Sequence, residues 1–193
     1  MVEVLERGDV GFFYRPTVQP ADAIEVTPGI QAFFMILSPS HGHFHRRVRI
    51  GRKRLPVRHG ERLWSRVERV GSMQRVLADQ LESETYTTKT RGARFQPGAV
   101  PVAQGCYAFV RHEDHTHFVY RVEHTEPVAE LELPAAMSMI VLFERAQPAN
   151  AVWTTGGLPT QLDFEGEELV LVGAHDEPEL ELGIEVLPVS CPA

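Results

Sequence analysis

Residues 105–123 read Gly-Cys-Tyr-Ala-Phe-Val-Arg-His-Glu-Asp-His-Thr-His-Phe-Val-Tyr-Arg-Val-Glu, and they predict a β-hairpin. Two runs rich in β-branched and aromatic residues flank a short polar break, which is the pattern of two antiparallel strands joined by a turn. A two-residue loop at 113–114 places Arg111 opposite Thr116, and a four-residue loop at 112–115 gives the same pair. The strand register is therefore the same for both loop lengths.

Alternation of side chains along each strand sorts this hairpin into two faces. One face pairs Tyr107 with Tyr120 and Phe109 with Phe118. Because it is aromatic, we expect this face to point into the core. The opposite face gathers three histidines: His112, His115 and His117.

The three histidines have more than one interpretation. Neutral imidazoles are ligands of transition metals, and three of them leave open coordination positions for catalysis. The sequence therefore allows a metal site for an ion such as Zn or Fe at His112, His115 and His117. The alternatives are a polar turn whose histidines are simply solvated, or acid–base chemistry without a metal.

The rest of the chain predicts further strands and one long helix. Residues 30–37 form an apolar run suited to a buried strand, and residues 43–50 alternate, with Arg46 interrupting the apolar face near the strand's open end. Residues 60–82 carry an apolar stripe at helical spacing, in which Leu63, Val67 and Val70 recur. In this interpretation Trp64 is a packing residue.

These elements predict an α+β fold in a single domain, 1–193. There is no regular alternation of strands with helices, so a doubly wound parallel sheet is not expected. We expect a mainly antiparallel, strongly curved sheet or partial β-barrel, with one long amphipathic helix at about 60–82.

The charges are unevenly distributed along the chain. The net charge is −7, yet residues 46–94 hold 14 Lys and Arg against 5 Asp and Glu. One interpretation is that this basic segment lies beside the acidic C-terminal half in the fold. The other is a basic surface for phosphate groups. The second predicts eight residues that bind an anionic ligand: Arg47, Arg49, Arg52, Lys53, Arg54, Lys89, Arg91 and Arg94.

Composition places the chain among ordinary globular proteins. Hydrophobic residues make up 43% and charged residues 23% of the sequence, and no apolar run approaches the ~20 residues that cross a bilayer. The N-terminus lacks a basic and an apolar region of the kind found in signal peptides. Two cysteines do not make a disulfide framework. We therefore expect a cytoplasmic protein with reduced thiols and no membrane partner.

The sequence does not decide whether the chain is an enzyme. Its best-supported function is binding of an anionic ligand, either a phosphorylated small molecule or nucleic acid, on the basic surface from 46–94. One alternative is a metal-dependent enzyme that uses the hairpin histidines. Another is a structural or subunit-interaction domain.

Overall fold

The computed structural model describes residues 2–23, 29–79, 82–125, 128–145, 152–175, 177–182 and 187. The elements are, in chain order, β1 (Val2–Pro16), β2 (Gln19–Pro20), β3 (Ile30–Pro39), β4 (His45–Ile50), η1 (Gly51–Lys53), β5 (Arg62–Gly71), α1 (Met73–Leu77), β6 (Glu84–Thr88), β7 (Gly92–Gln96), β8 (Val100–His112), β9 (His115–His124), η2 (Ala129–Leu131), β10 (Ala136–Arg145), β11 (Val152–Thr154), η3 (Pro159–Asp163), β12 (Glu168–His175) and α2 (Pro178–Leu182).

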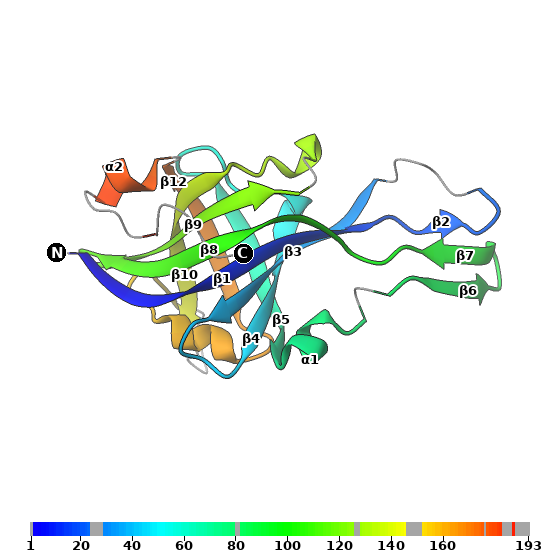
Figure 1. Cartoon of the computed structure of the whole chain (residues 1–193), viewed down its shortest axis with the longest axis horizontal. Helices are drawn as coiled ribbons and strands as arrows, with labels where there is room; N and C mark the ends of the chain where they lie inside the picture. Colours follow the sequence, from blue (N-terminus) through cyan, green and yellow to red (C-terminus); the bar gives the residue numbers. More distant parts are fainter. Residues whose placement is uncertain are drawn as a thin grey trace.

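Eight of these strands form a closed antiparallel barrel (Figure 1). Around the ring they follow the order β1, β3, β4, β5, β12, β10, β9 and β8. Each half of the chain supplies four consecutively paired strands, β1 to β5 without β2, and β8 to β12 without β11. The pairings of β1 with β8 and of β5 with β12 join the two halves. The expected α+β class is therefore wrong, although the expected antiparallel pairing is confirmed.

Strands β8 and β9 form the predicted hairpin in the predicted register. Arg111 lies opposite Thr116, and His112 lies opposite His115. The turn is residues 113–114, and Glu113 has a φ of 57° there, as a tight turn requires. The hairpin prediction is confirmed residue by residue.

The aromatic face of the hairpin points into the barrel, as predicted. Tyr107, Phe109, Phe118 and Tyr120 are fully buried, and Phe12 from β1 packs edge-on against Tyr120. Side chains therefore fill the barrel interior, as in other eight-stranded barrels. Three buried leucines from the connecting segments extend the same core: Leu55, Leu131 and Leu162.

The long helix predicted at 60–82 is absent; β5 and the five-residue α1 occupy this stretch. Leu63 and Val67 face the interior by strand alternation, opposite the interior-facing residues of neighbouring strands. A β-bulge then leaves Glu68 without a cross-strand partner on β4. This shifts the alternation by one residue, so the Val70 side chain also points inward. Spacings of four and then three residues imitate a helix, which explains the wrong prediction.

Two short helices cover parts of the outer surface of the barrel. Val76 of α1 packs against Phe34 and Ile36 on the outer face of β3. Leu182 of α2 packs on the outer face of the β8–β9 hairpin, together with Cys106. Within the described part of the chain, no helix is long and apolar enough to cross a membrane.

Strands β2, β7 and β6 form a separate three-stranded sheet that projects from one end of the barrel (Figure 1). We call residues 17–23 and 82–99 of this projection the arm. Four of the five residues of β6 are exposed, and β6 is an edge strand of this sheet.

The cross-strand partners Tyr107 and Tyr120 form a matched pair for a stability test. The Tyr107 hydroxyl donates a hydrogen bond to Glu6 Oε1 at 2.7 Å, whereas the Tyr120 hydroxyl has no partner among the described residues. We expect Tyr107→Phe to lower the free energy of unfolding by about 1.5–3 kcal/mol, because it removes a hydrogen bond to a charged group. We expect Tyr120→Phe to leave it unchanged or raise it by up to about 1 kcal/mol.

Urea denaturation of the two variants and the wild type measures both effects. A Tyr120→Phe variant that loses as much stability as Tyr107→Phe would contradict the assignment of an unpartnered hydroxyl.

Candidate functional site on the outer wall of the barrel

The eight predicted ligand-binding residues do not form one surface. The structure divides them among three places: Arg47 and Arg49 on β4, Arg52, Lys53 and Arg54 at η1, and Lys89, Arg91 and Arg94 on the arm. The arm projects away from the barrel, to which β4 belongs (Figure 1). The basic segment of the sequence is thus not a single basic site.

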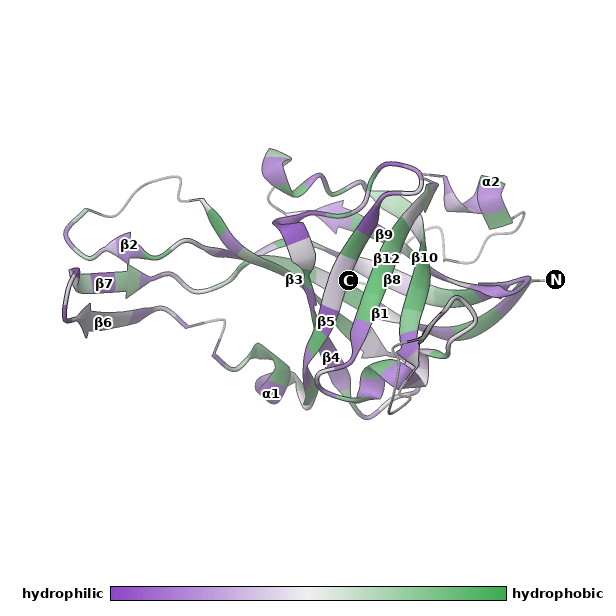
Figure 2. Ribbon diagram, turned by 180° about the vertical axis from the view of Figure 1, so that it is seen from behind, coloured by the Kyte–Doolittle hydropathy of each residue, from purple (hydrophilic) through white to green (hydrophobic). Residues whose placement is uncertain are grey.

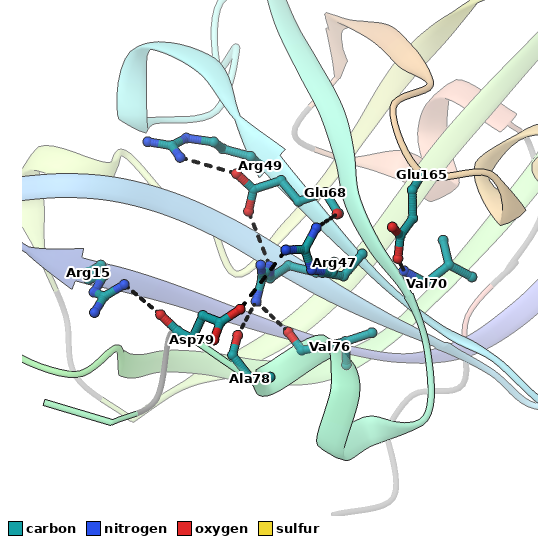
Figure 3. A network of polar contacts seen from close by, with 10 residues as sticks. Arg15, Arg47, Arg49, Glu68, Val70, Val76, Ala78, Asp79 and Glu165 are labelled. Carbon is teal, nitrogen blue, oxygen red and sulfur yellow. Dashed lines mark hydrogen bonds and ion pairs between the residues drawn. The ribbon is translucent and has the colours of Figure 1, made fainter. Parts of the chain in front are cut away.

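Arg47 holds α1 in place (Figure 3). Its side chain is 3% exposed, and its Nη1 donates to the carbonyl oxygens of Val76 and Ala78 at 2.7 and 2.9 Å. Its Nε donates to Glu68. Burial lowers the pKa of Arg47, although Glu68 acts against this shift. These contacts satisfy carbonyls at the C-terminal end of a helix, so Arg47 has a structural role.

At η1 the side chains of Arg52 and Lys53 are exposed to solvent. Lys53 donates to the carbonyl oxygen of Ile30 at 2.7 Å, and Arg54 pairs with Glu61 and Glu132. Arg52 is exposed and has no ion pair within the described ranges. On the arm, Arg94 Nη2 donates to the Val18 carbonyl oxygen, whereas Lys89 and Arg91 extend into solvent.

The outer face of β5 carries residues that the helix prediction concealed. Arg62, Trp64 and Arg66 are exposed and alternate along the strand, and Trp64 is 55% exposed. On β4, Arg49 lies directly opposite Arg66 and is also exposed. We call Arg49, Arg62, Trp64 and Arg66 the Arg–Trp wall. A strand assignment of 62–71 would have revealed it, because a period of two puts these side chains on one face.

A second tryptophan supports the wall. Trp153 of β11 meets Trp64 edge-to-face, with ring centroids 4.9 Å apart. Val170 of β12, the cross-strand partner of Trp64, faces outward yet is buried. Figure 2 shows that the adjoining strands β12 and β10 are largely apolar. Trp64 therefore lies beside the apolar side chains of Trp153 and Val170, while about half of its own surface is exposed to solvent.

The wall keeps uncompensated positive charge. Like charges directly opposite each other, as in Arg49 and Arg66, destabilise a sheet. Glu68 contacts Arg49 at 3.1 Å, and Glu168 lies opposite Arg66 on β12. Neither Arg62 nor Arg66 forms an ion pair with any residue that the structure describes. An anionic ligand would relieve this repulsion.

The hairpin histidines share one face, as predicted, and α2 covers part of it. His117 is 4% exposed, with Nδ1 3.0 Å from Ser138 Oγ and 3.7 Å from Glu181 Oε2. The rings of His112 and His115 lie 6.0 and 6.5 Å from that of His117. No group of three metal-ligating side chains is arranged to hold an ion in the described part of the chain, and the metal site stays a prediction.

Cys106 lies on the same outer face of the hairpin and is disulfide-bonded. The expectation of reduced thiols is therefore wrong. Because disulfides are rare in the cytosol, the cysteines no longer support a cytoplasmic location.

Comparisons with models of protein families, with curated proteins and with solved structures found no match to this chain. The functional argument therefore depends on the residues themselves.

The buried histidine makes stability depend on pH. Burial lowers the pKa of His117; His112 and His115 add to this, while Glu181 opposes it. The unfolded chain then binds a proton that the folded chain does not, so stability falls as the pH drops through about 6.5, the ordinary pKa of histidine. We expect His117→Asn, which cannot titrate, to show a smaller loss of stability between about pH 8 and about pH 5.5.

Urea denaturation at the two pH values measures this difference, and His43→Asn, at an exposed position, is the matched control. If the stability of His117→Asn depends on pH as steeply as that of the wild type, the buried imidazole is not the source.

Proposed function

We propose that the Arg–Trp wall binds single-stranded nucleic acid through its phosphates and through a base stacked on Trp64. The observation that carries this proposal is the half-exposed Trp64 on one strand face between Arg62 and Arg66, neither of which forms an ion pair with a described residue. Proteins that bind single strands without sequence preference combine a positive surface with aromatic rings on which bases stack. A small molecule with a single phosphate, the other anionic ligand that the sequence suggested, cannot engage both arginines at their spacing along β5.

The spacing along β5 supports this geometry. Alternate residues of a strand are about 6.6 Å apart, so Arg62 and Arg66 lie about 13 Å apart with Trp64 midway. Two phosphates that are two nucleotides apart on an extended strand can then contact Arg62 and Arg66, while a base between them meets the indole. Guanidinium groups bind phosphate through paired hydrogen bonds, which an ammonium group cannot do.

The adjoining carboxylates limit the expected affinity. Glu68 and Glu168 partly neutralise Arg49 and Arg66, so the wall is a weaker polyanion surface than its arginines alone suggest. We therefore expect binding that is measurable at low salt and falls steeply as salt increases.

Fluorescence anisotropy with a labelled oligothymidine of about ten nucleotides tests the proposal. We expect Trp64→Ala to weaken binding by about tenfold, because stacking contributes about 1–3 kcal/mol per base. We expect Arg66→Ala to reduce the slope of log affinity against log salt by about 0.7, the contribution of one phosphate.

The matched control is Arg111→Ala on β8, which removes the same charge from the opposite side of the ring of strands. Equal losses in Arg66→Ala and Arg111→Ala would show a general charge effect. Absence of binding by the wild type at about 50 mM salt would overturn the proposal. Equal affinity for a mononucleotide would instead identify a small ligand.

A further inference from the structure

A second candidate site lies at the end of the barrel that contains η3. A cavity of about 270 Å³ opens there between β1, the β3–β4 connection and η3. Its lining includes Arg46, the one charged residue that the sequence placed on the apolar face of β4. The Arg–Trp wall does not contribute to it.

Arg46 forms the floor of the cavity and is 3% exposed. Its Nη1 and Nη2 donate to the two carboxylate oxygens of Glu6 at 2.7 and 3.0 Å, and its Nε donates to Asp163 Oδ1 at 2.8 Å. The Tyr107 hydroxyl donates to the same Glu6 oxygen as Nη1. Burial acts to lower the pKa of Arg46, but Glu6 and Asp163 raise it overall, so the guanidinium is charged.

A β-bulge directs Glu6 into this position. Val4 pairs with the outward-facing Val110, and Glu6 pairs with the inward-facing Phe109, so Leu5 is the additional residue. Without the bulge, Glu6 would lie on the outer face with Val4. Bulges of this kind are common at barrel rims and beside binding sites, where they redirect a side chain.

The network is not explained by stability. Replacing buried ion pairs by apolar side chains of similar volume is often neutral or stabilising. An apolar end layer would have continued the core that already fills the barrel. Three charged side chains lie beside a cavity there instead, an arrangement that suits the binding of a charged ligand.

The charges around the cavity select the ligand. Two carboxylates share one guanidinium, which leaves one negative charge at the floor. Arg7 and His41 also line the cavity, but they are exposed and lie at its rim. The wall is apolar, and it includes Phe44, which is 55% exposed.

We propose that this cavity binds a small organic ammonium ion. The ammonium group donates hydrogen bonds to the carboxylates of Glu6 and Asp163 and neutralises their excess charge. The hydrocarbon part contacts Leu5 and the ring of Phe44, which also attracts the cation through its π face. This function goes beyond nucleic-acid binding and uses charge of the opposite sign at a different place.

Titration with n-butylammonium chloride, followed by NMR of the backbone amides at constant ionic strength, tests the proposal. The uncharged probe of the same length is n-butanol. We expect shifts confined to residues around the cavity, and an affinity for the ammonium at least about tenfold higher than for the alcohol. Equal binding of the two probes, or no binding of the ammonium, would overturn the proposal.

Two variants locate the binding site. Asp163→Asn preserves an oxygen that can accept from Arg46 but removes the excess charge, and we expect it to weaken ammonium binding by about tenfold. Phe44→Ala should also weaken it, whereas Phe164→Ala, at another exposed phenylalanine, should not. Thermal unfolding checks that Asp163→Asn is folded. Because Phe44 is exposed, we do not expect Phe44→Ala to disturb folding.

Unchanged binding in both variants would place the ammonium elsewhere and contradict the assignment. Trp64→Ala should retain full ammonium binding, so failure of the nucleic-acid proposal and failure of this one are distinguishable.

Discussion

The pairing of β9 with β10 closes the sheet into a barrel, and the rest of the structure depends on that closure. In a closed barrel every strand has one face in a filled interior and one face outside. Strict alternation then decides the environment of each side chain. Tyr107 and Phe109 reach the core because the hairpin register puts them inside. The same register puts His112 and His117 outside, where α2 becomes necessary to cover part of that face.

Alternation also explains why adjacent arginines have unrelated roles. Arg46 and Arg47 are consecutive on β4, and both are 3% exposed. Arg46 points inward and is paired with carboxylates, whereas Arg47 points outward and donates to the carbonyl oxygens of α1. Each burial is tolerated because the guanidinium donors find acceptors. A slip of β4 by one residue would exchange the two environments and leave both charges without partners.

The hairpin could be predicted from the sequence, and β5 could not. The hairpin prediction depended on strand alternation alone, and both loop lengths gave one register. At β5 the apolar residues Leu63, Val67 and Val70 have helical spacing because a bulge at Glu68 interrupts the alternation. A bulge is set by pairing with β4, which lies elsewhere in the sequence, so no local pattern reveals it. Closure of the ring is likewise a long-range event. The sequence did place Arg46 on the apolar face, which is where the structure has it.

Each proposed site lies beside a bulge, and this is a consequence of building sites on a barrel. A regular strand of a barrel has one face in the core and one face in solvent. A binding site needs a polar group that is partly buried and lies beside space for a ligand, and neither face alone provides this. The bulge at Leu5 turns Glu6 from the outer face to the rim of the interior, where it meets Arg46 and Tyr107. The bulge at Glu68 puts an extra carboxylate on the outer face, where it contacts Arg47 and Arg49. That carboxylate neutralises Arg49 of the Arg–Trp wall, whereas Arg62 and Arg66 have no ion-pair partner among the described residues. The irregular positions of the strands thus separate the two charges, negative at the end of the barrel and positive on its wall.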